Sequence, residues 1–317
     1  KDAYWKLGSF QEDMSERFMS LAVRNPHLKL TLDEFTVPFR GRHRARCYNA
    51  SKPERYHLKG FSLNEAGTGY CLQWYMYQGK HEERPKDMPA TAFPAWKLLT
   101  PLGNLHNRGC TLYADNWFTG IKTISTVVEM GIDYVGTCKT NRTGGACKDT
   151  RGFFKKAKRG KYRVEKQRST DLWATQWQDK KVVTIMSTHP GPVGKIFRKT
   201  VDKNSGAYTP SWYPCPAIVS AYNKGKVGTD RMDQMVAAYY KNRRMRWHLK
   251  VLQHISYIAA FNAFTTWKEY TKSKAGMLDF LESLVRYHGR AAHKARKDNK
   301  DKHTPMMPVN KRDSKRN

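Results

Sequence analysis

The stretch Leu112-Tyr-Ala-Asp-Asn-Trp-Phe-Thr-Gly120 decides how the rest of the chain is arranged. It predicts a short buried strand, Cys110 to Ala114, that places one carboxylate, Asp115, just beyond its end. Thr119 stands where a helix N-cap belongs, and apolar residues at helical spacing follow as far as Met130-Gly131. A carboxylate between a core strand and a helix is typical of α/β sites, because ligands gather at the carboxyl ends of strands.

The charge is the strongest bulk signal in the sequence. The 317 residues hold 58 lysines and arginines against 27 aspartates and glutamates, a formal net charge of +31. A chain this basic generally has a polyanionic partner, and nucleic acid is the first candidate. The alternative is a soluble basic protein whose charge serves no partner. With 39% hydrophobic and 12% aromatic residues, the sequence can build a packed core.

The sequence predicts no membrane span and no secretory signal. No run approaches the roughly 20 apolar residues of a transmembrane helix, and the N-terminus carries no apolar signal segment. The six cysteines form no CxxC pair, which favours reduced thiols in the cytosol or nucleus and does not support a zinc site. Because the chain begins at Lys1 rather than Met, we expect it to be a piece of a longer protein.

The order of predicted elements indicates an α/β fold. Three strands, Leu30–Phe39, Tyr56–Leu63 and Tyr70–Tyr77, have short connections, as in an antiparallel meander. A proline-rich loop with a weak helix then leads to the strand before Asp115, and Ile132–Cys138 is the fifth strand. We therefore expect a mixed five-stranded sheet with helices on its faces.

The composition changes from about residue 141. The next segment is rich in base, lacks clear helical pattern and contains a predicted hairpin of Leu172–Trp177 with Val182–Ser187. Helical pattern resumes near Gly228 and continues to about Tyr270, and a last helix spans roughly Met277–Tyr287. We expect a β-rich basic insertion followed by helices and a basic tail.

Carboxylates within apolar stretches stand out in a chain so poor in acids. Asp33 lies in the middle of the first predicted strand, and Asp230 and Asp233 are three residues apart on one helix face. Singly, each is more simply explained as an N-cap, a turn residue or an ion-pair partner of arginine. Together with Asp115 they supply oxygen ligands of the kind that Mg²⁺ prefers. Two such ions clamp the attacking and leaving oxygens of phosphoryl transfer.

Several specific strings occur in order over about residues 20–270. They are Leu32-Asp-Glu34 with Phe39-Arg-Gly-Arg42, Asp115-Asn-Trp-Phe-Thr119, and Tyr222-Asn followed by Gly228-Thr-Asp-Arg-Met-Asp-Gln-Met235. In these strings the chain resembles the piggyBac transposase family. The resemblance implies an RNase H-like catalytic domain of the DDE/DDD recombinase type. It also implies an all-β insertion between the fifth strand and the final catalytic helix.

The resemblance implies domain boundaries and roles for the acids. We expect a helical lead-in (1–28), the first part of the RNase H-like catalytic domain (29–140) and a β-rich basic insertion domain (141–220). The helical part of the catalytic domain (221–287) and a basic flexible tail (288–317) follow. By motif, Asp33, Asp115 and Asp230 would be the catalytic triad that holds two Mg²⁺ or Mn²⁺ ions. Asp233 would be a fourth catalytic acid close to the site.

The implied activity is that of a cut-and-paste DNA transposase. Family members cut double-stranded DNA at transposon ends, form hairpin intermediates, and integrate at TTAA through a 3′-hydroxyl nucleophile. We accordingly expect transposon ends and TTAA target DNA as partners, a homodimer of the full-length protein, nuclear localisation and no membrane. The sequence departs from the family at Arg244-Met-Arg-Trp-His248, where His248 replaces a proline. The N-terminal dimerisation region and the cysteine-rich zinc domain of the family are not visible in this chain.

Basic segments with interleaved aromatic residues predict the DNA contacts. Residues 153–181 combine lysine and arginine with aromatic side chains, which suits phosphate contact together with base stacking. For two tryptophans there, Trp173 and Trp177, the favoured interpretation is that they belong to the core of the insertion. Two further basic stretches follow Asp33 and Asp233, which would bring guanidinium groups near the metal site. The predicted DNA-binding residues are Arg40, Arg42, Lys155, Lys156, Lys158, Arg159, Lys161, Arg163, Lys241, Arg243, Arg244, Arg246 and Trp247.

Three functions remain open at the level of sequence. The first is an active piggyBac-type transposase. The second is a domesticated, catalytically silent derivative kept as a DNA- or chromatin-binding protein. The third, an unrelated RNase H-like nuclease, requires the shared strings to be a coincidence. Since silent derivatives often lose a catalytic acid and this sequence has not, the sequence favours an active enzyme.

Overall fold

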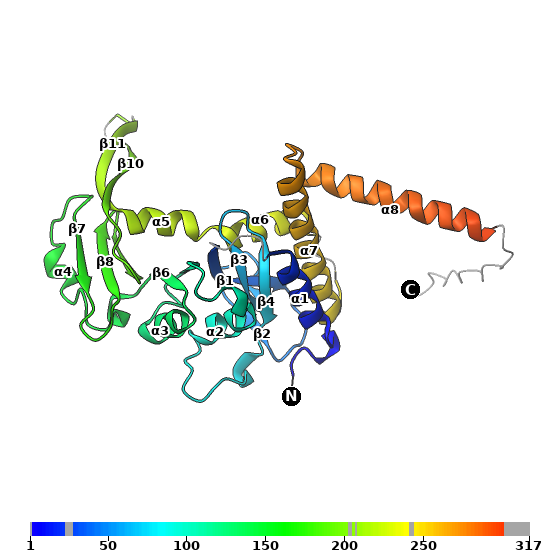
Figure 1. Ribbon diagram of the computed structural model, residues 1–317, viewed down its shortest axis with the longest axis horizontal. Helices are drawn as coiled ribbons and strands as arrows, with labels where there is room; N and C mark the ends of the chain where they lie inside the picture. The colour runs from blue at the N-terminus through cyan, green and yellow to red at the C-terminus, as the bar shows by residue number, and fades with distance from the viewer. Residues whose placement is uncertain (1, 23–27, 202–204, 207, 241–243, 301–317) are drawn as a thin grey trace, which may run out of the picture. The chain divides into compact units, whose positions relative to one another are not determined.

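The chain is built around one wide mixed sheet (Figure 1). The computed structural model describes residues 2–22, 28–201, 205–206, 208–240 and 244–300. These residues belong to two compact units, Lys1–Thr265 and Thr266–Asn317. The first unit contains the sheet, and the second contains the end of the longest helix together with the last helix.

The central strands of the first unit have the RNase H-like order. β1 (Lys29–Pro38) pairs antiparallel with β3 (Tyr56–Glu65), which pairs antiparallel with β4 (Cys71–Met76). On the other side of β1, β5 (Thr111–Ala114) and then β6 (Asp133–Thr137) continue the sheet in parallel. The order β4-β3-β1-β5-β6 places the third, second, first, fourth and fifth predicted strands side by side. The predicted mixed α/β fold is therefore confirmed.

The sheet is wider than the five strands predicted. The hairpin of β8 (Trp173–Gln178) and β9 (Val182–Ser187) is confirmed, but β9 also pairs antiparallel with β6. β7 (Tyr162–Lys166) adds to β8, and the short β2 (Arg46–Tyr48) adds to β3 at the opposite edge. The result is a nine-stranded sheet in the described part of the chain. The insertion therefore extends the sheet, because the edge of β6 is available for pairing.

A second, smaller sheet follows. β10 (Val193–Val201) and β11 (Tyr208–Pro216) form an antiparallel two-stranded ribbon. Short helical turns complete the connections of this unit. They are 3-10 helices at Trp5–Leu7, Gly79–His81, Thr100–Leu105 and Thr140–Arg142, and the one-turn α4 (Thr150–Phe153).

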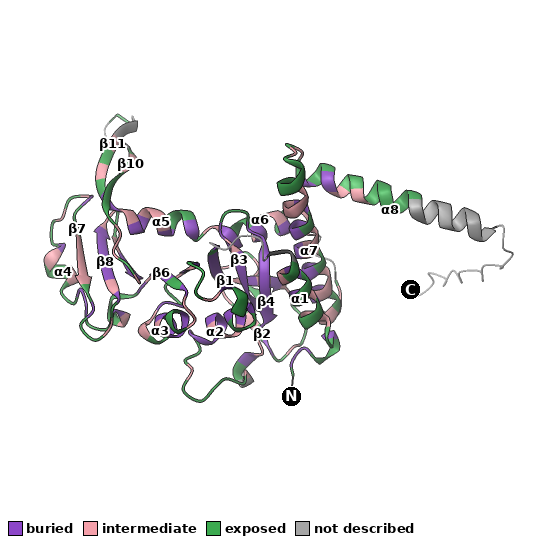
Figure 2. Cartoon of the chain, in the orientation of Figure 1, coloured by how far each residue is buried: buried purple, intermediate pink, exposed green. Residues whose placement is uncertain are grey.

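Two apolar layers cover the sheet, one on each face. Because side chains alternate along a strand, Leu112 and Ala114 of β5 belong to the layer of α2 (Phe93–Leu99) and α3 (Ile121–Glu129). Tyr113 belongs to the opposite layer, which contains α5 (Ala217–Gly225). Figure 2 shows buried residues along β4 and β8 of the same sheet. Asp115 follows Tyr113 by two residues and therefore belongs to the α5 face.

The helices agree with the prediction at one point and differ from it at two. α1 (Phe10–Ala22) packs on β4 and matches the helical lead-in, whose residues 23–27 lie outside the described residues. The single helical stretch predicted from Gly228 to about Tyr270 is divided into α6 (Gly228–Tyr239) and α7 (Trp247–Thr271), because Tyr240 takes an extended conformation. α5 begins at Ala217, within the last residues of the predicted β-rich insertion (141–220), and continues to Gly225.

The last helix is longer than the sequence pattern indicated. α8 (Met277–Lys300) continues beyond Tyr287 into residues predicted as a flexible tail. The apolar periodicity ends near Tyr287, but the following alanine, lysine and arginine residues are good helix formers. Within the described residues, no helix is long and apolar enough to cross a membrane.

His254 on α7 is buried beside β1. Its ring stacks on Phe35 with the centroids 5.3 Å apart, and Tyr240 approaches it edge-on at 5.7 Å. Neither ring nitrogen has a hydrogen-bond partner among the described residues, and burial lowers the pKa of His254 to about 4. Protonation of His254 is therefore less favourable in the folded chain than in the unfolded chain, where its pKa is the ordinary value of about 6.5.

Acidification should destabilise the protein through His254. The folded pKa lies below the unfolded one, so stability is lost as the pH falls from about 6.5 towards 4. Between pH 7 and pH 5 this amounts to about 2 kcal/mol. Urea unfolding at both pH values measures it. His254→Phe should lack this component, while His189→Gln at an exposed position should keep it. The same pH dependence in His254→Phe and wild type would contradict the prediction.

Candidate active site

Asp33 and Asp115 are neighbours on parallel strands. Leu32 of β1 is paired with Ala114 of β5, so an aspartate is the next residue along each strand. Asp33 follows Thr31 by two positions and Asp115 follows Tyr113 by two, so both carboxylates belong to the α5 face of the sheet. Both residues are half-buried. The pairing brings together two acids that are 82 positions apart in the printed numbering.

A turn fixes the carboxylate of Asp115. Its Oδ1 accepts a hydrogen bond from the backbone N–H of Trp117 at 2.8 Å, as aspartates commonly do in turns. Thr119 donates its hydroxyl to the carbonyl of Asp115 at 2.7 Å, and this hydroxyl lies 2.9 Å from that of Tyr134. The prediction that Thr119 caps the following helix is wrong. Gly120 is the N-cap of α3, because the Thr119 hydroxyl is used on the Asp115 turn.

Glycines and one buried threonine fasten the junction of α5 and α6 to the sheet. Thr31 of β1 donates its hydroxyl to the carbonyl of Gly225 at 2.6 Å. A Cβ atom at Gly225 would lie 2.4 Å from the ring of Tyr113, and one at Gly228 would lie 2.8 Å from the carbonyl oxygen of Glu65. The helices therefore approach the strands more closely than any larger residue would allow.

A buried asparagine fixes the first turn of α6. The side-chain oxygen of Asn64 on β3 accepts hydrogen bonds from the hydroxyls of Ser62 at 2.7 Å and Thr229 at 3.1 Å. Its amide donates to the carbonyl of Gly69 at 2.9 Å. Since Thr229 directly precedes Asp230, this network sets where α6 presents its carboxylates.

The four predicted acids are close enough for their charges to interact. The pKa of Asp33 is raised to about 7, chiefly by burial and also by the charges of Asp115 and Asp230. Burial also raises the pKa of Asp233 to about 8, with Asp33 and Asp230 adding to the shift and Lys52 opposing it. The neighbouring carboxylates therefore disfavour the charged forms of Asp33 and Asp233, as in a cluster of like charges.

The donor set suits a hard divalent cation. Among the described residues, no three acidic, histidine or cysteine side chains are already placed to hold a metal ion. The chemistry nevertheless fits, because the cluster consists of carboxylates and a cation would relieve their mutual repulsion. Asp33 and Asp115 each use Oδ1 to accept a backbone N–H, at 2.7 and 2.8 Å, which orients both groups before any ion binds.

Two lysines beside the acids were missed at the level of sequence. Lys52 pairs with Glu34 at 3.1 Å, and Lys59 reaches the same carboxylate at 4.0 Å. Lys59 also lies 5.3 Å from the ring centroid of Trp117, which is 37% exposed next to Asp115. No motif marks these lysines, because the pairing of β1 with β3 and the loop before β3 brings them to the site.

Tyr222 on α5 is a further residue of this site. Burial raises its pKa, followed by the charges of Asp115, Asp33 and Asp230, so the phenol lies near the acid cluster. Its hydroxyl is 3.2 Å from that of Thr137 at the end of β6. The Tyr222-Asn string that contributes to the family resemblance contained this signal.

The predicted arginines of two separate motifs meet in one pocket of about 990 Å³. The cationic residues that line it are Lys6, Arg40, Arg42, Arg244, Arg246 and Lys250, together with one acid, Glu54. Trp247 also lines the pocket, and its ring lies 5.6 Å from Tyr4 and 4.9 Å from His43. We call this set the basic pocket. Lys241 and Arg243, also predicted to bind DNA, lie outside the described residues.

The basic pocket is not at the acids. It begins at Pro38, five residues beyond Asp33, which is about 17 Å along an extended strand. The sequence interpretation placed these arginines near the metal site by continuing the helix of Asp233. The structure ends α6 at Tyr239 instead, so Arg244 does not follow that helical path.

Four of the lysines predicted in the insertion are exposed. They are Lys155, Lys156, Lys158 and Lys161. Lys161 donates to the carbonyl of Phe153 at 2.6 Å and lies 4.3 Å from its ring centroid, which fixes its direction. All four stand between α4 and the start of β7, where a phosphate can reach them.

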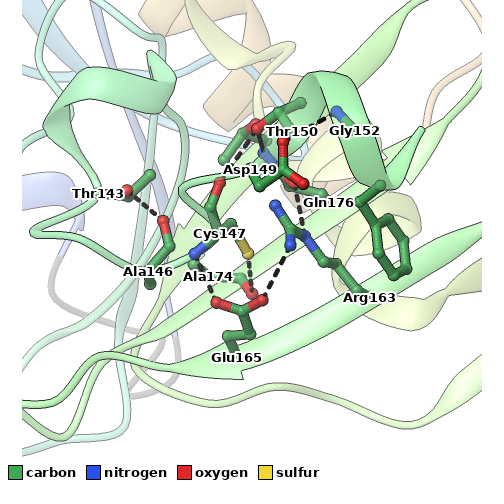
Figure 3. Close-up of polar contacts among 12 residues, drawn as sticks. Thr143, Ala146, Cys147, Asp149, Thr150, Gly152, Arg163, Glu165, Ala174 and Gln176 are labelled. Carbon is green, nitrogen blue, oxygen red and sulfur yellow. Dashed lines mark hydrogen bonds and ion pairs between the residues drawn. The ribbon is translucent and has the colours of Figure 1, made fainter. Parts of the chain in front are cut away.

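The two predicted arginines of the insertion serve its structure. Figure 3 shows Arg163 between Glu165, with which it pairs at 3.1 Å, and Gln176, to which it donates at 2.9 Å. Arg159 pairs with Asp179 at 2.9 Å. The two guanidinium side chains are 14% and 18% exposed, so they hold the strands of the insertion together. Phosphate contact in this region falls to the lysines.

The strand order, the two apolar layers and the acids on β1, β5 and α6 define an RNase H-like α/β protein with a carboxylate site on its sheet. The family model described as Transposase IS4 matches residues 1–264. The chain belongs to this family of transposases, and the predicted relationship to piggyBac transposases is confirmed by its relatives.

The relatives carry piggyBac names. The chain is 24% identical over 292 residues to human PiggyBac transposable element-derived protein 3, covering 90% of this chain and 47% of that protein. It is 30% identical over 156 residues to human PiggyBac transposable element-derived protein 2, covering 48% and 26%. A cryo-EM structure of a piggyBac transposase synaptic complex with hairpin DNA has a similar fold, with a TM-score of 0.67 and 23% identity. That match covers 82% of this chain and 52% of the solved one, so the chain spans about half or less of these proteins.

Removing the hydroxyl of Thr31 should loosen the junction of α5 and α6. Thr31→Val preserves the shape of the side chain but leaves the Gly225 carbonyl without this donor, which should cost about 1–3 kcal/mol of unfolding free energy. Thr126→Val is the matched control, because the Thr126 hydroxyl donates to Lys122 within α3, at 2.9 Å. Urea unfolding compares the two. An equal or smaller cost for Thr31→Val would show that the junction does not depend on this bond.

Proposed function

We propose that the chain is the catalytic core of a piggyBac-type DNA transposase, which cleaves DNA strands and joins them to a target. The observation that carries the proposal is the register of β1 with β5, which puts Asp33 beside Asp115 under the helix that bears Asp230 and Asp233. Membership of a transposase family supports it. So does a fold shared with a transposase solved as a synaptic complex with hairpin DNA.

Two Mg²⁺ or Mn²⁺ ions are the proposed cofactors. Asp33, Asp115 and Asp230 would hold them, with Asp233 beside them. When bound, the ions would neutralise charge on the reacting phosphate. The protein's own part is to fix the carboxylates in advance, through the Asp115 turn and the Asn64 network. This placement reduces the reorganisation that the reaction requires.

Positive charge on two sides of the acids supports DNA as the substrate. The basic pocket lies beyond the end of β1, while the exposed lysines of the insertion lie beside β7, at the opposite edge of the sheet. In this proposal, a duplex held at both places runs over the carboxylates, and its contacts with phosphate set its position. By resemblance to the family, we propose transposon ends and TTAA as the DNA, a homodimer of the full-length protein, and a nuclear location.

Asp115→Asn should abolish strand cleavage without abolishing DNA binding. The amide oxygen can still accept from Trp117, so the turn should persist while the charge is lost. We expect at least about a 100-fold lower rate, since charge stabilisation of several kcal/mol is removed. The assay is nicking, by full-length protein with Mg²⁺, of a duplex that carries its own transposon ends.

Asp133→Asn is the matched control for this experiment. Asp133 is an exposed acid at the start of β6, where it pairs with Thr111 at the opposite end of β5 from the Asp115 turn. Its variant should cleave at the wild-type rate. A wild type that binds DNA but is as inert as Asp115→Asn would instead identify a silent DNA-binding derivative.

Neutralising the basic pocket should reduce the salt dependence of DNA binding. Arg42 and Arg246 are both exposed there, and each phosphate contact contributes about 0.9 to the slope of log K against log salt. Arg42→Ser with Arg246→Ser should lower the slope by about 1.8. Fluorescence anisotropy over a salt series measures it. Lys86→Ser with Lys122→Ser, exposed positions outside the pocket, should leave the slope unchanged, and an equal effect of both pairs would contradict the prediction.

A further inference from the structure

In the described part of the chain, the ribbon of β10 and β11 contributes no residue to the acids or to the basic pocket. Its register pairs Phe197 with Trp212 and Lys195 with Pro214. Figure 1 shows it extending past the ends of β7 and β8. Neither strand contains an aspartate or glutamate.

One face of the ribbon is fixed to the wide sheet. Arg198 pairs with Asp179 at 3.6 Å and lies 5.7 Å from the ring centroid of Trp177. The indole N–H of Trp177 donates to the carbonyl of Pro214 at 2.8 Å, and Trp177 is 1% exposed. The prediction that Trp177 belongs to the core is therefore confirmed. The packing of the ribbon is achieved through this inner face.

The outer face is exposed, aromatic and basic. Phe197 and Trp212 are cross-strand partners, so their rings share a face, and they meet at 5.4 Å with a 63° angle. They are 41% and 66% exposed. Lys195 and Lys199, two positions on either side of Phe197, share this face by strand alternation and are also exposed. We call these four residues the ribbon face.

We propose that the ribbon face binds double-stranded DNA. In this arrangement Lys195 and Lys199 contact phosphates, and the Phe197–Trp212 pair lies against sugars and base edges in a groove. A two-stranded β-ribbon has dimensions that the major groove admits. The inference rests on the proposed function for the DNA itself, but it assigns residues that neither the family strings nor the basic run contained.

Charge decides between DNA and a second copy of the chain as the occupant. An exposed aromatic pair usually marks an interaction surface, which either occupant would satisfy. The ribbon face carries only positive charge, and the chain carries +31 overall. Two copies brought together through this face would repel each other, whereas phosphate would be attracted.

The ribbon is close enough to the acids to contact the same duplex. From Trp212, β11 continues to Pro216 and leads directly into α5, which ends at Gly225 near the sheet. With about 3.3 Å per strand residue and 1.5 Å per helix residue, Trp212 lies at most about 35 Å from Asp230 along the chain. This is about one helical turn of DNA. A duplex positioned at the acids would therefore reach the ribbon face within about ten base pairs.

The test is DNA affinity of exposed variants. Binding of the 317-residue chain to a fluorescent 40-base-pair duplex of mixed sequence is measured over a salt series. Trp212→Ala should raise the Kd about tenfold, because contacts of aromatic rings with nucleotides are worth about that much. Lys195→Ser with Lys199→Ser should lower the salt slope by about 1.8.

Matched controls separate this effect from a general loss of charge or apolar surface. Trp5→Ala removes a tryptophan that is 65% exposed, against 66% for Trp212. Lys86→Ser with Lys122→Ser removes two exposed lysines elsewhere. Both controls should bind as wild type does. Thermal melting checks that each variant is folded, and the lysine pair tests the same face without changing an aromatic residue.

Equal Kd values for Trp212→Ala and Trp5→Ala, with an unchanged salt slope in the lysine variant, would overturn the inference. Light scattering in the absence of DNA tests whether a second copy of the chain binds the ribbon face instead. If Trp212→Ala abolishes self-association and leaves the Kd unchanged, the face belongs to a second copy. Cleavage with Mg²⁺ is measured in parallel. If the wild type never cleaves DNA but its binding depends on Trp212, the inference stands and the proposed function is overturned. If the wild type cleaves DNA and the variants bind as it does, only the inference is overturned.

Discussion

The parallel register of β1 with β5 is the constraint on which the site depends. Leu30 pairs with Leu112 and Leu32 with Ala114, and all four side chains are almost fully buried on the α2 and α3 face. Because side chains alternate, a slip of one residue would carry an aspartate towards that apolar layer and expose leucines to the other. Hydrophobic burial on one face therefore fixes two carboxylates side by side on the opposite face.

That arrangement places carboxylates close together, and the surrounding structure offsets their mutual repulsion. Burial and neighbouring acids raise the pKa of Asp33 and Asp233, so ionising these two carboxyl groups is unfavourable in the folded chain. Backbone N–H groups orient Asp33 and Asp115, and the Asn64 network holds α6 in place against the repulsion. A local conflict maintained by well-formed surroundings is typical of functional sites rather than of structural ion pairs.

The sequence predicted those parts that depend on local pattern or on a specific string. Strand alternation and turn signals identified the strands of the RNase H-like core, and two of the motifs contain Asp33 and Asp115, which the register of β1 with β5 places side by side. The sequence did not predict contacts between distant segments. Nothing local indicates that β9 joins the edge of β6, that the Thr119 hydroxyl turns back to Asp115, or that Arg163 is used by Glu165 and Gln176. The break at Tyr240 had the largest consequence, since it moved Arg244 from the acids to the basic pocket.

The distribution of charge separates affinity from chemistry in the proposed function. The basic pocket and the lysines of the insertion attract phosphate at the flanks, whereas a phosphate at the centre meets the carboxylates of Asp33, Asp115 and Asp230. DNA can therefore be held at the flanks without a cation, but its phosphate can enter the centre only when positive charge is supplied there. An active transposase and a silent DNA-binding derivative would share every flanking contact and differ only at the acids. Binding alone consequently says little about which of the two this chain is, and the discriminating property is whether a divalent cation changes how the central phosphate is held.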